Sequence, residues 1–388
     1  MSLLFFVGAC GNETDAFVEP GTLPDDPMQN DMMPDDTAGP GNDEEPLDLL
    51  EGKGIVVSGD YAGNGLLSTV DLAETAVASN VVAGVVGGDP VVKQLADQLF
   101  VLDRFGGDSV TALTRNAELL YQISLGAGSN PQDIAVVGTE AFVVNYGRAT
   151  LSKFDIEANE PLAEEFADLS SLDPEDGNPD CNSIVSVGDA LFVSCQLQDR
   201  STFITRGAGV VAVVDSGSGD LIDTIELSNS NPFGWMATSS DGDILISTVP
   251  SFLDLTMGCV ERIETAGGVA YAGCEVENST LGGYANKLVF FEETGRWMAA
   301  VASSFASGRI VEETTSGWQG VDFFGEDSNP VDLQFCENGE LLVSDNLMDA
   351  RGLRTYAPTA TSWQETTLMP LNVSWHEGFA PNNALACW

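Results

Sequence analysis

The chain has 388 residues, and its 60 Asp and Glu against 14 Lys and Arg give a formal net charge of -46 at pH 7. This balance excludes a nucleic-acid-binding surface, because each phosphate contact needs a cation and no basic cluster occurs in the sequence. Hydrophobic residues make up 43% of the chain, which is enough for a large core.

The chain begins with an apolar run that ends in Val7-Gly8-Ala9-Cys10. These four residues resemble the lipobox of bacterial lipoproteins, in which a Cys is diacylated and becomes the N-terminus after cleavage. The resemblance implies a signal segment over residues 1–10 and a lipid on Cys10, with Gly11 typical of export to the outer membrane. No basic residue precedes Cys10, so the charged start of a usual signal is absent. The alternative is an apolar start with an accidental cysteine.

Residues 11–52 contain 13 Asp and Glu and no Lys or Arg, together with many Pro, Asn and Gly. Such a segment cannot bury enough apolar surface to offset the entropy of ordering it. Its like charges also keep it extended. The sequence therefore predicts a disordered acidic tether between the lipid and a folded domain at residues 53–388.

From Gly54 onward, short β-branched apolar runs alternate with Gly, Asn, Asp and Ser, which predicts strands. Five runs share a polar residue, an apolar stretch and a small or acidic end: residues 98–103, 140–145, 189–194, 243–248 and 340–345. Asx-Pro pairs lie upstream of them: Asp89-Pro90, Asn130-Pro131, Asn178-Pro179, Asn231-Pro232 and Asn329-Pro330. These prolines are 41, 48, 53 and 98 residues apart, so one repeat is hidden in the last interval, near residues 285–301.

A period of 40 to 50 residues built from four strands is typical of β-propeller blades. Residues 130–156 resemble one repeat of the YVTN-type β-propeller family. The resemblance implies that the Asx-Pro corner leads into the innermost strand, that residues 142–144 form the second strand and that residues 151–155 form the third.

The count of repeats predicts an all-β fold of seven four-stranded blades. Six blades follow residue 89, while residues 54–88 supply only the later strands of another, near residues 55–60, 66–71 and 80–84. The missing innermost strand is assigned to residues 383–388, so that pairing of the two ends of the chain closes the ring. Six or eight blades stay open as alternatives, because residues 157–178 obscure the repeat.

Six cysteines remain after Cys10, and an even number in an exported chain predicts disulfides. Cys181 and Cys195 are equidistant from a turn at Gly188, and Cys259 and Cys274 are centred between Ala266 and Gly267. Cysteines at such positions of a hairpin face each other. Elimination leaves Cys336 with Cys387, on two predicted innermost strands.

Candidates for chemistry are few. The only histidine, His376, excludes enzymes that need paired histidines, and no Gly-x-Ser-x-Gly elbow occurs. Asp173, Glu175, Asp176 and Asp180 gather carboxylates in one loop, as a Ca²⁺ site would, although an acidic solvated turn explains them as well. Trp318, Trp375 and His376 are candidates for a ligand-binding surface. Trp235 and Trp297 are expected to pack in the core.

These features predict a monomeric, lipid-anchored β-propeller that binds a protein or glycan at the outer membrane or cell surface. The lipid would be its only membrane contact, because no later run approaches the roughly 18 apolar residues of a spanning helix. The alternative is an extracytoplasmic hydrolase that uses two carboxylates, with Ca²⁺ as its cofactor. The absence of catalytic motifs favours binding.

Overall fold

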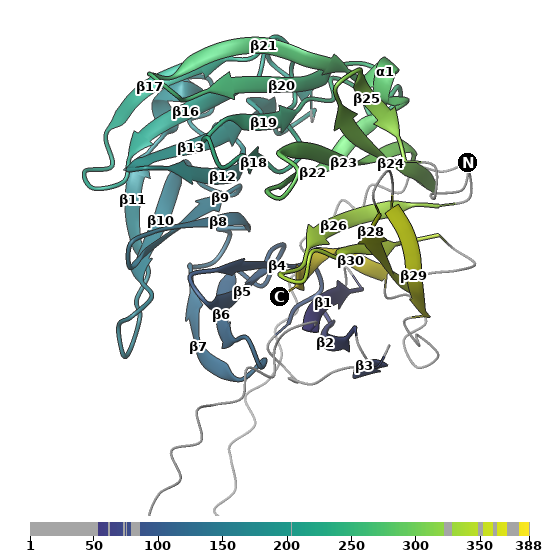
Figure 1. Cartoon of the computed structure of the whole chain (residues 1–388). Helices are drawn as coiled ribbons and strands as arrows, with labels where there is room; N and C mark the ends of the chain where they lie inside the picture. The colour runs from purple at the N-terminus through teal and green to yellow at the C-terminus, as the bar shows by residue number, and fades with distance from the viewer. Residues whose placement is uncertain are drawn as a thin grey trace, which may run out of the picture. The chain divides into compact units, whose positions relative to one another are not determined.

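The structure is a computed structural model that describes residues 53–60, 63–72, 74, 76–78, 86–202, 204–321, 328–347, 352–359, 363–370 and 380–387. Its strands form seven four-stranded antiparallel sheets around a common centre (Figure 1). This arrangement confirms the predicted seven-bladed β-propeller. No helix among these residues is long and apolar enough to cross a membrane.

The blades are numbered here in chain order, and their strands are given from the centre outward. Blade 1 consists of β30 (Ala380–Cys387), β1 (Lys53–Gly59), β2 (Gly65–Asp71) and β3 (Ala76–Ala78). Blade 2 consists of β4 (Pro90–Leu95), β5 (Gln98–Asp103), β6 (Ser109–Thr114) and β7 (Leu119–Ser124). Blade 3 consists of β8 (Pro131–Val137), β9 (Glu140–Asn145), β10 (Thr150–Asp155) and β11 (Glu164–Asp168).

Blade 4 consists of β12 (Cys181–Val187), β13 (Ala190–Cys195), β16 (Val210–Asp215) and β17 (Leu221–Glu226). Blade 5 consists of β18 (Ala237–Thr238), β19 (Ile244–Ser247), β20 (Cys259–Glu264) and β21 (Ala270–Glu277). Blade 6 consists of β22 (Tyr284–Phe291), β23 (Arg296–Ser304), β24 (Ser307–Thr314) and β25 (Gly317–Gly320). Blade 7 consists of β26 (Pro330–Phe335), β27 (Leu341–Asp345), β28 (Gly352–Pro358) and β29 (Trp363–Pro370).

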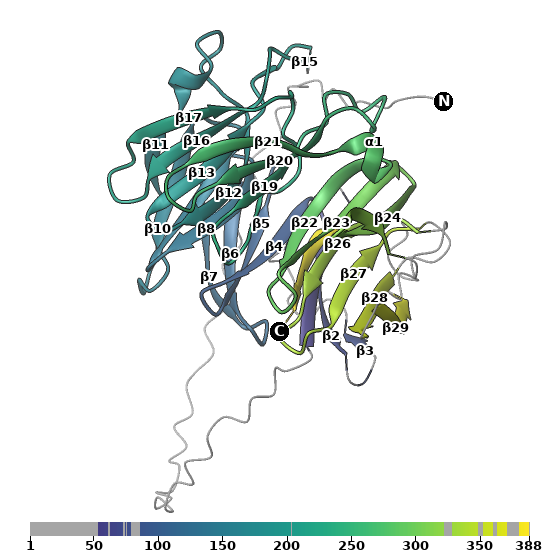
Figure 2. The same cartoon turned by 45° about the horizontal axis from the view of Figure 1, so that its top comes forward.

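Three short elements lie outside the blades: η1 (Ser170–Leu172), α1 (Asn278–Leu281) and the hairpin of β14 (Gln198–Asp199) with β15 (Ile204–Thr205). Figure 2 shows this hairpin beyond the ends of the strands of blade 4. The hidden repeat that the proline spacing predicted is blade 6. The predicted strand at residues 80–84 lies outside the described residues, and the outermost strand of blade 1 is β3.

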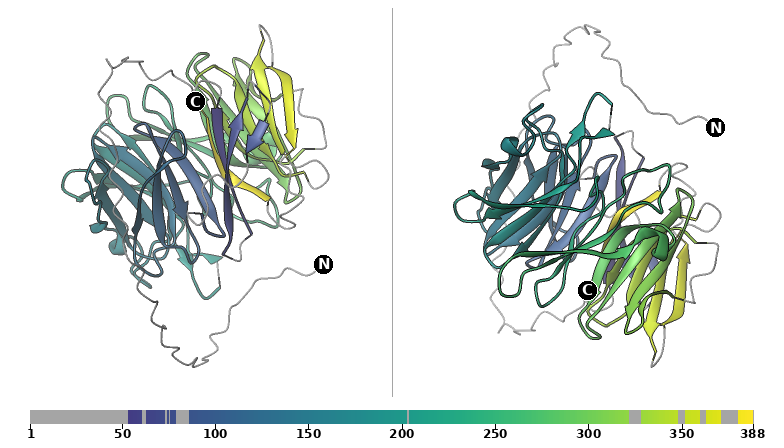
Figure 3. Two further views of the ribbon diagram at one scale, coloured as in Figure 1. Left: turned by 90° about the horizontal axis from the view of Figure 1, so that it is seen from below. Right: turned by 90° about the horizontal axis from the view of Figure 1, so that it is seen from above.

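Antiparallel pairing gives the ring two faces, at opposite ends of the strands (Figure 3). Face 1 carries the loops from each outermost strand to the next blade, together with the loops between second and third strands. Face 2 carries the loops between first and second strands and between third and fourth strands. Because every blade repeats one topology, the face of any loop follows from its place in the chain.

The Asx corners recur because they perform the same task in five blades. In each, the amide after the second strand donates to the carbonyl of the corner residue: Arg104 to Asp89, Tyr146 to Asn130, Gln196 to Asp180, Val249 to Asn231 and Asn346 to Asn329. The blade 4 corner is therefore Asp180, and the predicted Asn178-Pro179 corner was wrong by two residues. Asn130, Asp180 and Asn231 have φ of 48°, 53° and 55°, a left-handed conformation that Asn and Asp tolerate.

The two ends of the chain close the ring as predicted. β30 pairs with β1, so the last strand of the chain becomes the innermost strand of the first blade. A disulfide joins Cys336, just after the innermost strand of blade 7, to Cys387 at the end of β30. The covalent bond therefore connects the first and last blades, where an open ring would separate.

The other two predicted disulfides are also present. Cys181 and Cys195 occupy opposite positions in the β12–β13 pair and are bonded. Cys259 is bonded to Cys274 across the β20–β21 hairpin. The expectation that these two directly face each other was wrong, because two register shifts pair Cys274 with Glu261 instead.

Buried carboxylates join the innermost strands of neighbouring blades. Asp133 of β8 accepts hydrogen bonds from the Ser183 hydroxyl at 2.8 Å and the Ile184 amide at 2.9 Å, both on β12. Its other oxygen lies 2.5 Å from the Lys93 ammonium on β4. The carboxylate is 1% exposed, so these donors take the place of the water that it would bind in solution.

Asp332 repeats this arrangement on the other side of the ring. It accepts a hydrogen bond from the Leu385 amide of β30 at 2.8 Å and lies 2.9 Å from the Lys287 ammonium of β22. Trp235, which precedes β18, lies between the two lysines, with its ring centre 5.5 Å from Lys93 Nζ and 4.2 Å from Lys287 Nζ. The Ser183 hydroxyl also accepts a hydrogen bond from the Met236 amide at 2.9 Å. The contacts of Asp133, Asp332 and Trp235, called here the axial network, therefore involve residues of all seven blades.

We expect Asp133→Ala to lower the free energy of unfolding by about 3 kcal/mol, because it leaves the Lys93 ammonium and the Ile184 amide without their shared partner. Urea unfolding measures the change, with Asp133→Asn as a milder variant that keeps an acceptor. Asp97→Ala is the control, since Asp97 is 86% exposed in its pair with Arg115 and its loss should change stability by less than about 1 kcal/mol. Equal losses for the two alanine variants would contradict the structural role of Asp133.

Candidate binding face

Half of the large apolar side chains that are exposed in the described chain lie on face 1, mostly on blades 4 to 6. Seven residues on face 1 are more than a third exposed: Phe105, Ile204, Phe233, Phe252, Leu253, Met257 and Phe305. Only Phe105 lies outside blades 4 to 6. Four of the seven belong to blade 5 and form what we call the apolar cluster: Phe233, Phe252, Leu253 and Met257.

The apolar cluster comes from two loops that meet at the start of blade 5. Phe233 belongs to the loop that enters β18, and the other three residues belong to the loop between β19 and β20. The rings of Phe233 and Phe252 meet edge to face with centroids 4.9 Å apart. Leu253 is 91% exposed. Burying such a side chain on association would contribute roughly 2 kcal/mol to the free energy of binding. The cluster could therefore stabilise a complex.

The loop that carries the cluster is anchored from beneath. Val249, Leu255 and Tyr284 form a buried hydrophobic group under it, and burial raises the pKa of Tyr284. The side-chain amide of Asn278 on α1 donates hydrogen bonds to the carbonyls of Thr248 and Met257 at 2.9 and 2.7 Å. Gly258 closes the loop with φ of +89°, and a Cβ there would lie 2.4 Å from the Thr248 carbonyl oxygen. The apolar side chains therefore stand on a fixed backbone.

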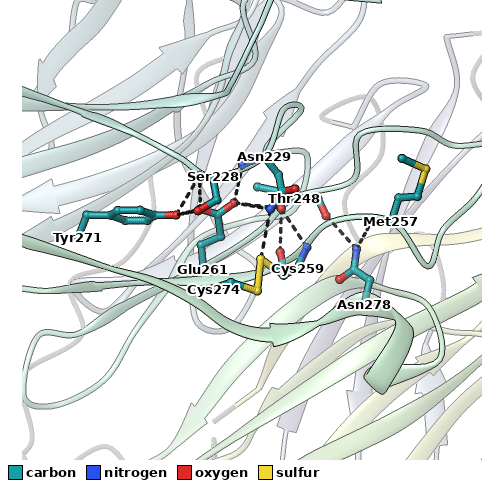
Figure 4. The surroundings of a disulfide bond; sticks show 9 residues. All are labelled: Ser228, Asn229, Thr248, Met257, Cys259, Glu261, Tyr271, Cys274 and Asn278. Carbon is teal, nitrogen blue, oxygen red and sulfur yellow. Dashed lines mark hydrogen bonds between the residues drawn. A yellow bond between two sulfur atoms is a disulfide. The ribbon is translucent and has the colours of Figure 1, made fainter.

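A second anchor is the carboxylate of Glu261, which is fully buried on β20 (Figure 4). It accepts hydrogen bonds from the amides of Ser228 and Asn229 at 2.8 and 3.1 Å, and from the Tyr271 hydroxyl. Burial and this last hydrogen bond raise the pKa of Tyr271. Glu261 thus ties the loop before β18 to the body of the blade, and no cation contacts it among the ion pairs of the described chain.

The apolar cluster lies in a region almost without charge. Segments 227–240, 248–258, 278–286 and 302–308, which form face 1 of blades 5 and 6, contain a single charged residue, Asp254. In the whole chain 19% of residues are charged. Depletion of charge together with exposed Phe, Leu and Met is typical of the core of a protein interface. Sequence reasoning missed this surface, although the segments of low charge around Phe233 and around Phe252 could have indicated it.

The predicted Ca²⁺ loop is occupied by arginines instead. The Arg206 guanidinium contacts Asp173 and pairs with Glu175 at 3.2 Å and Asp176 at 2.8 Å. Asp180 is fully buried and pairs with Arg200 at 2.8 Å. No group of three or more His, Cys, Asp or Glu among the described residues could hold a metal ion. The structure brings the four carboxylates together. Their ion pairs with Arg200 and Arg206 attach the segment of the β14–β15 hairpin to the loop before β12.

Of the other residues predicted for function, only Trp318 lies in the described part of the chain. Trp318 is half-buried on β25, the outermost strand of blade 6, where it packs against the core. Cys10, Trp375 and His376 lie outside the described residues. Of the tryptophans expected in the core, Trp297 is buried, whereas Trp235 is partly buried beside the two axial lysines.

One carboxylate on face 1 has an unusual proton affinity. Asp103, at the end of β5, is 7% exposed. Burial raises its pKa to about 6, with a smaller contribution from the negative charge of Asp89, although the Gly87 amide donates a hydrogen bond to it. Asp89 itself pairs with Arg104 at 2.5 Å. Asp103 therefore takes up a proton in the folded chain at a pH where the unfolded chain has released it.

This shift predicts that Asp103 destabilises the fold as pH rises from about 4 to 6, because the folded state must then give up a proton that the unfolded state no longer holds. Asp103→Asn keeps the acceptor for Gly87 and should raise the free energy of unfolding by up to about 3 kcal/mol at pH 7.5 and by nothing at pH 4. Urea unfolding at both pH values measures the difference. In the control Asp168→Asn the sign should reverse, since hydrogen bonds from Ser170 lower the pKa of Asp168. A pH-independent difference for Asp103→Asn would refute the assignment.

Comparison with known proteins supports the fold alone. A candidate 6-phosphogluconolactonase from Bacteroides fragilis superposes with a TM-score of 0.57 at 13% identity, over 88% of this chain and 99% of that one. Apo AztD from Citrobacter koseri has a TM-score of 0.52 at 13% identity, over 86% and 98%. Virginiamycin B lyase from Staphylococcus aureus has a TM-score of 0.52 at 9% identity, over 73% and 85%. No protein-family model and no curated protein sequence matches the chain.

Proposed function

We propose that this chain is an exported, lipid-anchored β-propeller of the YVTN type that binds an envelope protein through face 1 of blades 5 and 6. The observation that carries the proposal is the apolar cluster on a surface with one charged residue, in a chain whose net charge is -46. Four apolar side chains that are exposed on two fixed loops of an acidic protein are unfavourable in water and indicate a surface that a partner covers.

The three disulfides support an oxidising, extracytoplasmic compartment for the folded chain. The lipobox-like residues 7–10 and the acidic segment 11–52 are consistent with an anchor and a tether at the outer membrane or cell surface. β1 begins at Lys53 on face 2, because it is the second strand of its blade and runs toward face 1. The tether would therefore join the propeller on face 2, at the opposite end of the strands from the apolar cluster.

The carboxylate-based hydrolase that the sequence left open is less well supported. Such an enzyme needs two acids that can reach a substrate. The only carboxylates on the innermost strands of the described chain are Asp133 and Asp332. Each accepts hydrogen bonds from backbone amides and pairs with a lysine. Their hydrogen bonds hold blades together, so they cannot also act on a substrate without loss of the ring.

A photo-reactive amino acid in place of Leu253 should crosslink one envelope protein in the cell that makes this chain. The matched control is Leu162, which is 83% exposed but lies on face 2, between β10 and β11. With the captured protein purified, Leu253→Asp should weaken binding at least tenfold and Leu162→Asp should not, because a charge in the centre of an apolar contact must be desolvated. Crosslinking from Leu162 alone, or only to glycan, would overturn the assignment of face 1 to a protein partner.

The anchor is tested separately with radioactive palmitate in a Gram-negative host. The wild-type chain should carry the label and sediment with membranes, and Cys10→Ser should lose the label and become soluble, because the lipid would be the only membrane attachment. Cys10→Ser leaves the six cysteines of the propeller intact, so its three disulfides serve as a control for folding. Label retained in Cys10→Ser would show that the lipid is attached elsewhere, and a wild-type chain without label would show that no lipid is attached.

A further inference from the structure

The three disulfides differ in their exposure to solvent. Four of the six sulfurs belong to residues that are at most 5% exposed: Cys181, Cys195, Cys336 and Cys387. Cys259 is also fully buried. Its partner Cys274, however, is exposed on β21, the outermost strand of blade 5. A thiol in solution can therefore reach one sulfur of this bond without unfolding, whereas both sulfurs of the other two bonds are covered.

We propose that Cys259–Cys274 is a thiol–disulfide exchange site, which a dithiol reductant opens while the ring stays folded, and that its opening loosens the loop of the apolar cluster. The chemistry of exchange does not depend on the proposed function. Only the consequence for partner binding does, because it requires that the cluster be the contact surface.

In the first step a thiolate of the dithiol attacks Sγ of Cys274, the bond between the two cysteine sulfurs breaks, and Cys259 leaves as a thiolate. The Asn229 side-chain amide donates a hydrogen bond to Cys259 Sγ at 3.3 Å, which stabilises the leaving thiolate. The second thiol of the reductant then attacks its own sulfur in the mixed disulfide and releases Cys274. The dithiol ends as a disulfide, and its two protons end on Cys259 and Cys274.

Opening of this bond affects the cluster through the base of its loop. Thr248 lies at the start of this loop, and Cys259 is the first residue after it. Their backbones are joined by the Thr248 amide and hydroxyl, which donate to the Cys259 carbonyl at 2.9 and 2.8 Å. The disulfide ties Cys259 to β21, which also carries Tyr271, the donor to Glu261. Without the bond, β21 is an outermost strand held by hydrogen bonds, by the Arg262–Glu275 ion pair and by the packing of Val276, but by no covalent link, so the two anchors of the loop separate more readily.

The exchange site is tested on the full chain with Cys10→Ser, so that the only sulfurs are those of the three disulfides and the methionines. The protein is treated with dithiothreitol, trapped with N-ethylmaleimide at intervals and mapped by peptide mass spectrometry, while tryptophan fluorescence reports the fold. Cys259 and Cys274 should be labelled at least tenfold sooner than the other four cysteines, with fluorescence unchanged. Simultaneous labelling of all six, earlier labelling of another pair, or no labelling before unfolding would each overturn the proposal.

The coupling to the loop is tested by hydrogen exchange of the selectively reduced protein and of the double variant Cys259→Ser with Cys274→Ser. Amides in 248–258 should exchange at least tenfold faster in both samples, while the strand pair β12–β13 keeps its rate as the internal control. Unchanged exchange in 248–258 would overturn the coupling. Failure of crosslinking at Leu253 would remove the proposed partner and leave the labelling result standing, so the two proposals fail separately.

Discussion

The ring depends on carboxylates that are buried where its blades meet. Asp133 and Asp332 are each 1% exposed, and each joins the innermost strands of neighbouring blades through backbone amides and a lysine. A propeller blade buries its flanks against other blades, but its innermost strand also needs directional contacts that fix the spacing around the axis. Removing one partner of such a pair leaves a buried charge unpaired, which is why the arrangement tolerates little change.

The need to pair carboxylates also explains where the few cations of this acidic chain are found. Every Lys and Arg in the described ranges contacts a carboxylate or a backbone carbonyl, for example Arg206 with Asp176, and Arg309 with the Leu281 carbonyl. With 14 cations for 60 acids, cations occur where carboxylates gather or loops must be joined. The remaining acids keep the surface hydrated and self-repelling. Against this background, the surface on blades 5 and 6 with its single charged residue stands out.

Blade 5 combines features that the other blades do not share in the described structure. Its buried Glu261 accepts amides from the loop before β18, and its disulfide has one exposed sulfur. The loop above them presents Phe252 and Leu253 on a backbone held by Asn278. A rigid apolar contact surface lowers the entropy lost on binding. The nearby exchange site offers a way to remove that rigidity, which joins the two proposals in one structural unit.

The sequence by itself determined the fold class, the seven blades, the closure by the chain ends and the three disulfides. Strand period, Asx corners and cysteine spacing are local or periodic signals that survive without coordinates. It misplaced the corner at Asp180, because Cys181 stands where the other corners have proline. Only the tertiary structure decided that Arg206 and Arg200 occupy the acidic loop, that Lys93 and Lys287 meet at Trp235, and that Phe233 and Phe252 form one surface. Lys93, Trp235 and Lys287 come from three different blades, so their contacts exist only once the ring has closed. The other contacts join separate loops of one blade, so they exist only once that blade has folded.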